Sequence, residues 1–414
     1  MKILIVVAYF IPEVGSAAHV YFDLARAFVQ RGHEVDVIAS YPREFNLNHA
    51  DRSKEFPLDE IIDGIHVHRV KHPYTRDNII IRGLEHFFLS YYYFKKYREL
   101  KKKFDVCLFY IPPLPLWYLA KKIKRYDGTP SVLNFQDFHP QELTDVGVLT
   151  NPLMIRVLEH IEKDVYTKSD FIAVLSHGGI DYIVRRGGNP EKIAHIYNGI
   201  LRSDCQQFFK YGDFKKKNTI EDTFLISYAG ILSPFQGIDN ILDVAGQLRD
   251  HKDIIFFLVG DGMIKENLAK RIHDENLTNV RLMPLQPRDE YYNIVNSSDI
   301  NLISLEDRMK APCVPGKTIN LFASGKPVIA IVARESETAY VMNLINMDIV
   351  IQPGDTGSLK SAILRLKNDV TLRNRLGMAQ QQFFTENMSL EENVIAYERI
   401  FKKLIQDTSQ KSIR

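Results

Sequence analysis

Short apolar runs alternate with helical segments along almost the whole of this 414-residue chain. The runs are apolar nearly throughout rather than at every second residue, which predicts strands that are buried on both faces. Such strands belong to parallel sheets covered by helices, so the sequence predicts an α/β fold. The expected strands of the first half are 3–8, 35–39, 65–70, 106–110, 131–135, 171–175 and 193–197. Those of the second half are 224–229, 254–259, 280–283, 300–303, 328–331 and 349–351.

A polar, lysine-rich stretch at 203–223 separates the two sets of strands. A chain of this length is too long for one hydrophobic core, so the stretch is predicted to link two Rossmann-like domains, at 1–202 and 203–389. A helical pattern follows from about residue 390. Its apolar stripe consists of Val394, Tyr397, Phe401 and Leu404.

Composition excludes several classes of protein. The net charge of +2 gives no basic excess for binding nucleic acid. The three cysteines, Cys107, Cys205 and Cys313, have neither the spacing of metal ligands nor a plausible disulfide pattern, which favours the reducing cytoplasm. No apolar run reaches the roughly 18 residues of a membrane-spanning helix, so no such helix is expected.

The segment 311–330 is predicted to form a loop, a short helix and a strand. Pro315 and Gly316 lie in the loop, and Lys317 and Thr318 begin the helix. Free backbone N–H groups at a helix start, with a lysine beside them, favour an anion site, most plausibly for phosphate. The alternative is an ordinary connection with a solvated lysine.

Ligands of doubly wound sheets bind beyond the carboxyl ends of the strands, and with two such domains the expected site is the cleft between them. Gly15 and Ser16 follow the first strand and would allow close approach of a ligand to the backbone, although a plain turn explains them equally well. The loop is not G-x-G-x-x-G, which disfavours a dinucleotide.

Asp137 and His139 lie just beyond the strand 131–135. Either side chain could act as a base or hold a sugar hydroxyl. The alternative is that Asp137 caps the next helix and His139 packs against its neighbours.

The second half has several small, turn-rich loops at strand ends, which together suit a nucleoside diphosphate. Their candidate donor-binding residues are Gly230, Gln236, Gly260, Asp261 and Leu285. Asp261 could equally cap a helix. No Asp-x-Asp pair occurs in the sequence, so no metal ion is expected, and Lys317, helix termini and backbone N–H groups would have to balance the phosphate charge.

The segment 86–103 is aromatic first and then basic, with six cationic residues and one acidic residue between 95 and 103. This order suits the interface of an anionic bilayer. The candidate contact residues are Phe87, Tyr91, Phe94, Lys95, Lys96, Lys101 and Lys102. A core helix with a solvated basic end is the main alternative, and stacking on single-stranded nucleic acid is a more distant one.

Taken together, these loops resemble the retaining glycosyltransferases of family 4, which have the glycosyltransferase-B fold of two Rossmann-like domains. The resemblance runs along essentially the whole chain. It is carried by 12–35, by Ser176 with 198–199, and by 228–230, 260–262 and 325–328. Within the family, 136–140 and 314–317 look most like the surface-polysaccharide branch, which includes O-antigen and colanic-acid transferases similar to the acetamido-fucosyl type.

The resemblance implies an NDP-sugar donor, usually UDP-linked, bound mainly by the C-terminal domain. It implies a lipid-linked or growing glycan acceptor on the N-terminal domain, retention of configuration, and a final helix that returns to that domain. No cofactor and no metal are expected, and the location would be the cytoplasm, at the inner face of the cell membrane.

The resemblance also assigns roles to individual residues. Lys317 and the backbone of 315–318 would bind the diphosphate, and Asn320 would bind the ribose. Gly15 and Ser16 would approach the donor closely, while Asp137 and His139 would contact the transferred sugar.

The chain departs from the family pattern at four charged positions. Cys313 and Asn320 occupy the places of two glutamates seven residues apart, and Ile231 and Gln236 occupy those of an arginine and a lysine. The missing glutamates motivate one alternative to a transferase, a non-catalytic protein that binds a nucleotide-sugar or glycan. A second alternative, which no residue pattern demands, is a sugar-nucleotide epimerase of the same fold.

Overall fold

The computed structural model describes residues 1–413 except 14–15, 44–46, 48–50, 52, 73–78, 146, 148, 209–211, 308–313 and 346–348; for 16, 79–87, 208 and 411–413 it describes the backbone alone. Contacts divide the chain into two compact units, which are treated separately below. Unit 1 consists of Met1–Leu201 and Leu390–Arg414, and unit 2 of Arg202–Ser389.

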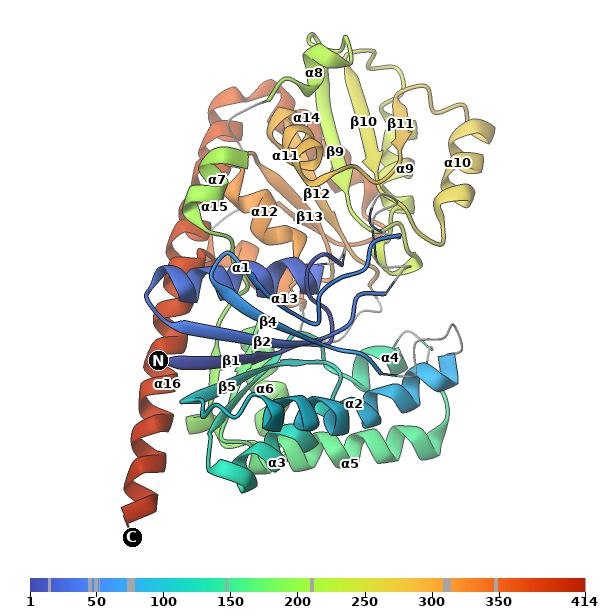
Figure 1. The fold of residues 1–414 in the computed structure, drawn as a ribbon. Coiled ribbons are helices and arrows are strands. Elements are labelled where there is room, and N and C mark those ends of the chain that lie inside the picture. The colour runs from blue at the N-terminus through green and yellow to red at the C-terminus, as the bar shows by residue number, and fades with distance from the viewer. Residues whose placement is uncertain are drawn as a thin grey trace. The chain divides into compact units, whose positions relative to one another are not determined.

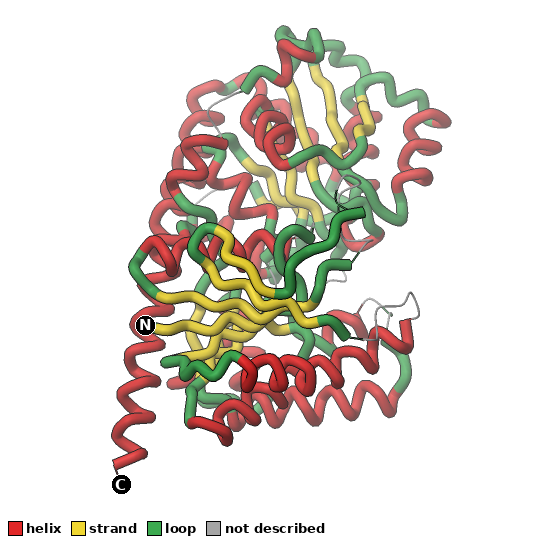
Figure 2. The backbone as a smooth tube through the Cα atoms, in the orientation of Figure 1, coloured by secondary structure: helices red, strands yellow, loops and turns green. Residues whose placement is uncertain are grey.

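Unit 1 contains an eight-stranded sheet in the order β3-β4-β2-β1-β5-β6-β7-β8, shown in Figures 1 and 2. All neighbouring strands are parallel except β3 and β4. The strands are β1 (Lys2–Val6), β2 (Glu34–Ser40), β3 (Asp59–Ile62), β4 (Ile65–Val70), β5 (Val106–Ile111), β6 (Ser131–Phe135), β7 (Phe171–Val174) and β8 (Ile193–His195).

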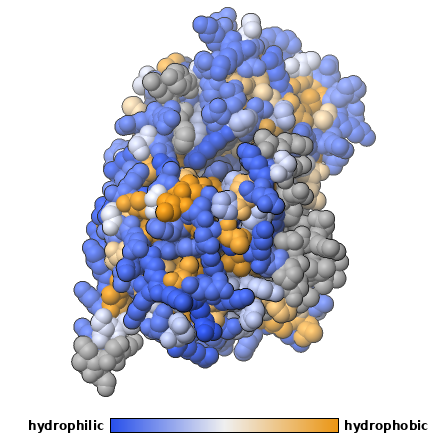
Figure 3. Space-filling model, viewed as in Figure 1, coloured by the Kyte–Doolittle hydropathy of each residue, from blue (hydrophilic) through white to orange (hydrophobic). Residues whose placement is uncertain are grey.

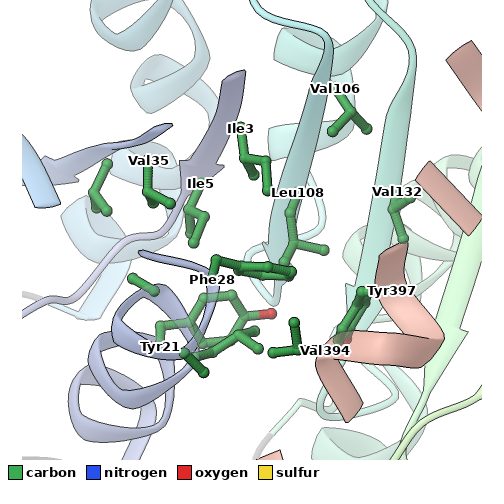
Figure 4. Close-up of a cluster of buried hydrophobic side chains, with 14 of the residues drawn as sticks. Ile3, Ile5, Tyr21, Phe28, Val35, Val106, Leu108, Val132, Val394 and Tyr397 are labelled. Atoms are coloured by element: carbon green, nitrogen blue, oxygen red, sulfur yellow. The ribbon is translucent and has the colours of Figure 1, made fainter. Parts of the chain in front are cut away.

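Helices cover both faces of this sheet. They are α1 (Ser16–Gln30), α2 (Ile79–Glu99), α3 (Leu116–Asp127), α4 (Gln141–Asp145), α5 (Pro152–Lys168), α6 (His177–Arg185), the 3-10 turn η2 (Pro190–Lys192) and α16 (Leu390–Ile413). One buried apolar cluster joins the sheet to α1 and α16 (Figure 4), and a second joins the opposite face to α2, α3, α5 and α6. The double covering explains why the strands are apolar on both faces.

The last helix, α16, belongs to unit 1. Its predicted stripe is confirmed, since Val394, Tyr397, Phe401 and Leu404 are all buried in the cluster of Figure 4. Glu398 of the same helix accepts hydrogen bonds from Arg31 at 2.5 and 2.9 Å and lies 2.9 Å from Nε2 of His33. Apolar packing and these charged contacts together hold α16 against α1.

Unit 2 contains a six-stranded parallel sheet in the order β11-β10-β9-β12-β13-β14. Its strands are β9 (Phe224–Ala229), β10 (Ile254–Val259), β11 (Val280–Met283), β12 (Ile300–Ser304), β13 (Val328–Ile331) and β14 (Val350–Ile351). Its helices are α7 (Arg202–Phe208), α8 (Phe214–Lys217), the 3-10 turn η3 (Pro234–Gln236), α9 (Asp239–Gln247), α10 (Lys265–Asp274), α11 (Arg288–Ser297), α12 (Lys317–Ala323), α13 (Glu337–Leu344), α14 (Thr356–Asn368) and α15 (Val370–Asn387).

The prediction of a linker at 203–223 is wrong for much of that stretch, which contains α7 and α8. Phe214 is 1% exposed and its ring lies 5.2 Å from that of Phe257, so it is part of the core of unit 2. Its backbone N–H donates to Oδ1 of Asn293 at 3.1 Å. The lysines around Phe214 made the stretch look polar, although Phe214 and Ile220 are both buried in the core of unit 2.

Strand β3 was not predicted. It pairs antiparallel with β4 through a turn at Asp63 and Gly64, both of which have positive φ. It lies at the edge of the sheet, and its residues alternate between exposed and half-buried, so it lacks the continuous apolar run that identified the other strands.

No helix in the described part of the chain is long and apolar enough to cross a membrane. The surface shown in Figure 3 is mostly hydrophilic, with hydrophobic side chains in separate groups.

Candidate functional site

The amine of Lys317 lies at the carboxyl end of the unit 2 sheet, on the first residue of α12. It donates a hydrogen bond of 3.0 Å to Oε1 of Gln236 and lies 3.9 Å from the centre of the Tyr228 ring. No carboxylate among the described residues forms an ion pair with it. Burial without a counter-charge lowers the pKa of this amine to about 7. The structure thus brings together two predicted residues, Lys317 and Gln236, and adds Tyr228.

Two glycines allow the loops beside Lys317 to pack closely. A Cβ atom on Gly260 would lie 1.8 Å from the carbonyl oxygen of Gly230. A Cβ atom on Gly230 would lie 3.3 Å from the Lys317 amine. The β9 and β10 loops therefore meet backbone to backbone, and the lysine amine rests against them.

The start of α12 offers fewer free groups for binding an anion than the sequence suggested. The helix has seven residues, and the backbone N–H of Thr318 already donates to the carbonyl of Pro315 at 2.9 Å. The side chain of Thr318 is fully buried, and its predicted contact with a ligand stays a prediction. Gly316 is exposed, and Asn320 is half-buried with Oδ1 3.4 Å from the Tyr292 hydroxyl.

Asp261 lies in the loop after β10 and stabilises that loop. Its Oδ1 accepts from the N–H of Gly262 at 2.9 Å, and its Oδ2 lies 3.1 Å from the Lys265 amine, which together lower its pKa. A hollow of about 430 Å³ beside it is lined in part by Met263 and Lys265.

Three apolar side chains are exposed on the loops after β9, β10 and β11. Leu285, which was predicted, is 61% exposed, and Ile231 and Met263, which were not, are 69% and 85% exposed. Apolar side chains presented to solvent at the ligand-binding edge of a sheet are available to cover a flat group such as a nucleobase.

Unit 1 brings a second group of polar residues together after β6. Ligand atoms of Asp137, His139 and Glu142 all lie within 4.8 Å of one another. Phe138, between the first two, is buried and its ring lies 6.1 Å from Phe135, so its neighbours on the chain point elsewhere. Glu142, on α4, accepts from the N–H of Phe138 at 3.0 Å and was missed by the sequence analysis.

The pKa shifts in this cluster show that its two carboxyl groups have, among the described residues, no nearby positive charge to stabilise their ionised forms. Burial raises the pKa of Asp137, and burial together with the nearby Asp137 raises that of Glu142 to about 7. Burial also lowers the pKa of His139 to about 4, so the imidazole is neutral near pH 7 and offers no counter-charge. Such a group can hold sugar hydroxyls, share a proton or hold a divalent cation.

Gly15 lies outside the described residues. Ser16 begins α1 at the carboxyl end of β1, as predicted, and its side chain is not described.

The segment 86–103 is mainly structural. Tyr93 and Tyr97 of α2 are buried in the core, and Phe94 stacks on Tyr97 with ring centres 6.4 Å apart. Lys96 donates to Asp59 at 2.6 and 2.9 Å, and Lys102 pairs with Asp36 and, at 2.7 Å, with Glu34.

Phe94, Lys96 and Lys102 thus have structural partners, because the sheet order places acidic strand residues beside the end of α2, and their membrane contact stays a prediction. Tyr91, Lys95 and Lys101 remain exposed, and the side chain of Phe87 lies outside the described part.

Comparison with known proteins identifies relatives along most of the chain. The chain is 23% identical over 330 residues to the probable glycosyltransferase WbjE of Pseudomonas aeruginosa, and the match covers 77% of this chain and 80% of the relative. It is 22% identical over 339 residues to the putative colanic acid biosynthesis glycosyl transferase WcaI of Escherichia coli, covering 78% and 82%.

Among solved structures, Anabaena Alr3699/HepE in complex with UDP superposes with a TM-score of 0.67 at 14% identity, covering 99% of this chain and all of that one. The predicted α/β fold with two parallel-sheet domains of the glycosyltransferase-B type is confirmed. Two family models match the sequence, "Glycosyl transferase 4-like domain" over 15–199 and "Glycosyl transferases group 1" over 211–383. Because the two matches together account for most of its length, the chain belongs to the glycosyltransferases that join these two domains.

Proposed function

We propose that this glycosyltransferase moves a sugar from a UDP-linked donor to a lipid-linked or growing glycan acceptor, with retention, in the synthesis of a cell-surface polysaccharide. The observation that carries the donor assignment is the Lys317 amine, which is sheltered and has no carboxylate partner among the described residues. A diphosphate would supply the missing negative charge. HepE, which has the same fold, is described in complex with UDP, and WcaI is named for colanic acid biosynthesis.

Unit 2 offers complementary groups for the rest of the donor. Asn320, three residues after Lys317, places an amide where a ribose hydroxyl could bond. Exposed Leu285 and Met263 offer apolar cover for the base. The closely packed Gly230 and Gly260 let a ligand approach the backbone. These groups replace charged contacts with neutral ones, so we expect Lys317 to provide most of the electrostatic attraction.

Asp137, His139 and Glu142 of unit 1 are proposed to hold hydroxyl groups of the transferred sugar or the acceptor. Neutral imidazole and a carboxyl pair that can share a proton offer both donors and acceptors without a large net charge. This combination suits an uncharged, hydroxyl-rich ligand.

Peripheral membrane contact is proposed for the exposed residues Tyr91, Lys95, Lys101 and Lys103 only. Changing Lys95, Lys101 and Lys103 together to glutamate should reduce binding to vesicles that contain anionic lipid. The ion-paired Lys102 should be left unchanged, so that loss of binding cannot be attributed to a disturbed fold. Equal binding of variant and wild type would refute this contact.

The donor assignment is tested with a panel of NDP-sugars, measuring thermal shift and slow hydrolysis of each. Lys317→Ala is expected to reduce hydrolysis on the order of a hundredfold, because a preorganised charge contact is lost. Lys270→Ala, an exposed lysine of α10 in the same unit, is the matched control and should leave the rate unchanged.

Unaltered hydrolysis by Lys317→Ala would refute the diphosphate assignment. Binding of an NDP-sugar without hydrolysis or transfer to any acceptor would favour a non-catalytic binding protein. Conversion of the NDP-sugar without an acceptor, to an isomer rather than to free sugar, would favour an epimerase.

A further inference from the structure

Among the described residues, the Lys317 amine has one ordinary hydrogen-bond partner and no opposite charge beside it. An ammonium group can donate three hydrogen bonds, and the described residues accept one, at Oε1 of Gln236. The Tyr228 hydroxyl lies 2.9 Å from the same Oε1 and 3.0 Å from the carbonyl of Ile231. The amine therefore sits over an aromatic ring beside a neutral amide, with donor capacity left over.

The two side chains that contact the amine, Tyr228 and Gln236, are uncharged. Those of Asn320 on α12 and of Tyr292 and Arg288 on α11 are uncharged or cationic. Tyr228 is on β9 and Gln236 on η3, and burial raises the pKa of the Tyr228 hydroxyl so that it stays neutral. Asn320 is on α12 itself and lies 3.4 Å from the Tyr292 hydroxyl of α11, whose ring faces Arg288 at 5.8 Å. None of these groups stabilises a positive charge on Lys317 as a carboxylate would.

Among the described residues, three carboxylates stand on the loops after β10 and β12, namely Asp261, Glu306 and Asp307, and none of them forms an ion pair with Lys317. Asp307 accepts from Nε2 of Gln352 at 2.7 Å. Asp261 pairs with Lys265 at 3.1 Å. Glu306 follows β12, and its backbone N–H donates to the carbonyl of Phe235 at 2.9 Å. In the described part of unit 2 the ammonium form of Lys317 must be desolvated without a counter-charge, a cost that an incoming anion would reduce.

We propose that a nucleoside diphosphate binds at Lys317 together with one proton, which a buffer acid transfers to the neutral amine as the complex forms. The inference rests on the proposed function, since it takes the diphosphate to be the ligand. The balance is simple: the amine nitrogen gains a proton, the buffer acid loses one, and the resulting ammonium group pairs with the phosphate oxygens.

The size of the effect follows from the amine's titration. With half of the free protein's Lys317 neutral at about pH 7, roughly 0.9 proton is taken up per diphosphate at pH 8 and roughly 0.2 at pH 6.5. The dissociation constant should rise about eightfold between pH 7.5 and 8.5. At pH 8 the terminal phosphate of UDP is already ionised, since such groups titrate near pH 6, so the ligand does not contribute there. At pH 6.5 the phosphate is still partly protonated and would release roughly as much proton as Lys317 takes up, so the measurement is made at pH 8.

The test is isothermal titration calorimetry of the full chain with UDP at pH 8, in buffers of low and high ionisation enthalpy. The difference in apparent enthalpy measures the protons taken up. Lys317→Arg is the matched variant, because a guanidinium group stays charged; it should bind UDP with no proton uptake and little dependence on pH. Gln236→Glu is a second variant: its carboxylate would keep Lys317 charged, so uptake should again vanish even if binding weakens.

The outcomes separate this inference from the proposed function. UDP binding by the wild type with less than about 0.2 proton at pH 8 would overturn the inference and leave the donor site standing. Undiminished uptake in Lys317→Arg would also overturn it, by assigning the proton to another group. Failure of UDP, GDP, ADP and dTDP all to bind would overturn the proposed function, and the inference with it.

Discussion

Replacing Glu398 by glutamine should destabilise unit 1 in a strongly pH-dependent way. The hydrogen bonds from Arg31, and then from His33, lower the pKa of this carboxyl group from 4.5 to about 2. Each pH unit between the two values is worth about 1.36 kcal/mol, which gives an upper limit of about 3 kcal/mol. The Arg31 side chain is 43% exposed, and solvent screening reduces the expected loss to about 2 kcal/mol at pH 7.

The sign of the pH dependence follows from the lowered pKa. The stabilisation is complete above pH 4.5, where the unfolded carboxyl is ionised, and is lost as the pH falls towards 2. The difference between wild type and Glu398→Gln should therefore shrink by about 1 kcal/mol between pH 6 and pH 3.5.

The assay is urea unfolding followed by the fluorescence of Trp117, the single tryptophan of the chain. It lies on α3, buried in the core of unit 1, so its signal reports on that unit. Asp407→Asn, an exposed carboxylate on the same helix, is the control and should change the unfolding free energy by less than about 0.5 kcal/mol. If Glu398→Gln matched the wild type at pH 7, or differed from it equally at all pH values, the role given to this ion pair would be refuted.

Three further predictions concern the candidate sites. Gly260→Ala should abolish UDP binding measured by calorimetry, because the added Cβ would lie 1.8 Å from the carbonyl oxygen of Gly230. Gly357→Ala is the control and should bind UDP normally, because the nearest atom to its added Cβ is Oδ1 of Asp355 at 3.8 Å. Glu142→Gln should stabilise unit 1 by about 2 kcal/mol above pH 8 and by nothing at pH 4. The raised pKa of Glu142 means that the wild type loses stability as the pH rises from 4.5 through about 7, whereas the glutamine variant does not. Unfolding followed by Trp117 fluorescence measures the difference, and a variant less stable than wild type at pH 8 would contradict the prediction. Chelation with EDTA should leave the affinity for UDP unchanged within about twofold, since Lys317 and not a metal ion is proposed to meet the diphosphate charge; a larger drop would point to a bound cation.

The parallel strands could be predicted closely, because burial on both faces leaves a continuous apolar run in the sequence. Eleven of the thirteen predicted ranges, such as 131–135 and 224–229, agree with the observed strands to within one residue at each end; the ranges 3–8 and 193–197 each run two residues too far. The edge strand β3 and the short helix α8 have no such signal, since their stability depends on one neighbouring strand or one buried phenylalanine.

Within the candidate sites, the sequence could predict only those residues that lie close to one another along the chain. Lys317 could be located because a Pro-Gly turn and a helix start lie next to it in sequence. Glu142 joins Asp137 only through the start of α4, and the partners of Lys96 and Lys102 lie on strands that the sheet order brings beside α2. Such contacts depend on tertiary structure and leave no local pattern.

The return of α16 to unit 1 has a consequence for biosynthesis. The ribosome makes residues 1–201 first, yet the apolar side chains of the sheet and of α1 that α16 covers stay exposed until 390–413 have been made. Unit 2 is continuous in the chain and can complete its own core earlier. The nascent protein thus carries an exposed hydrophobic surface during synthesis of the whole of unit 2, and the domain that is begun first is finished last.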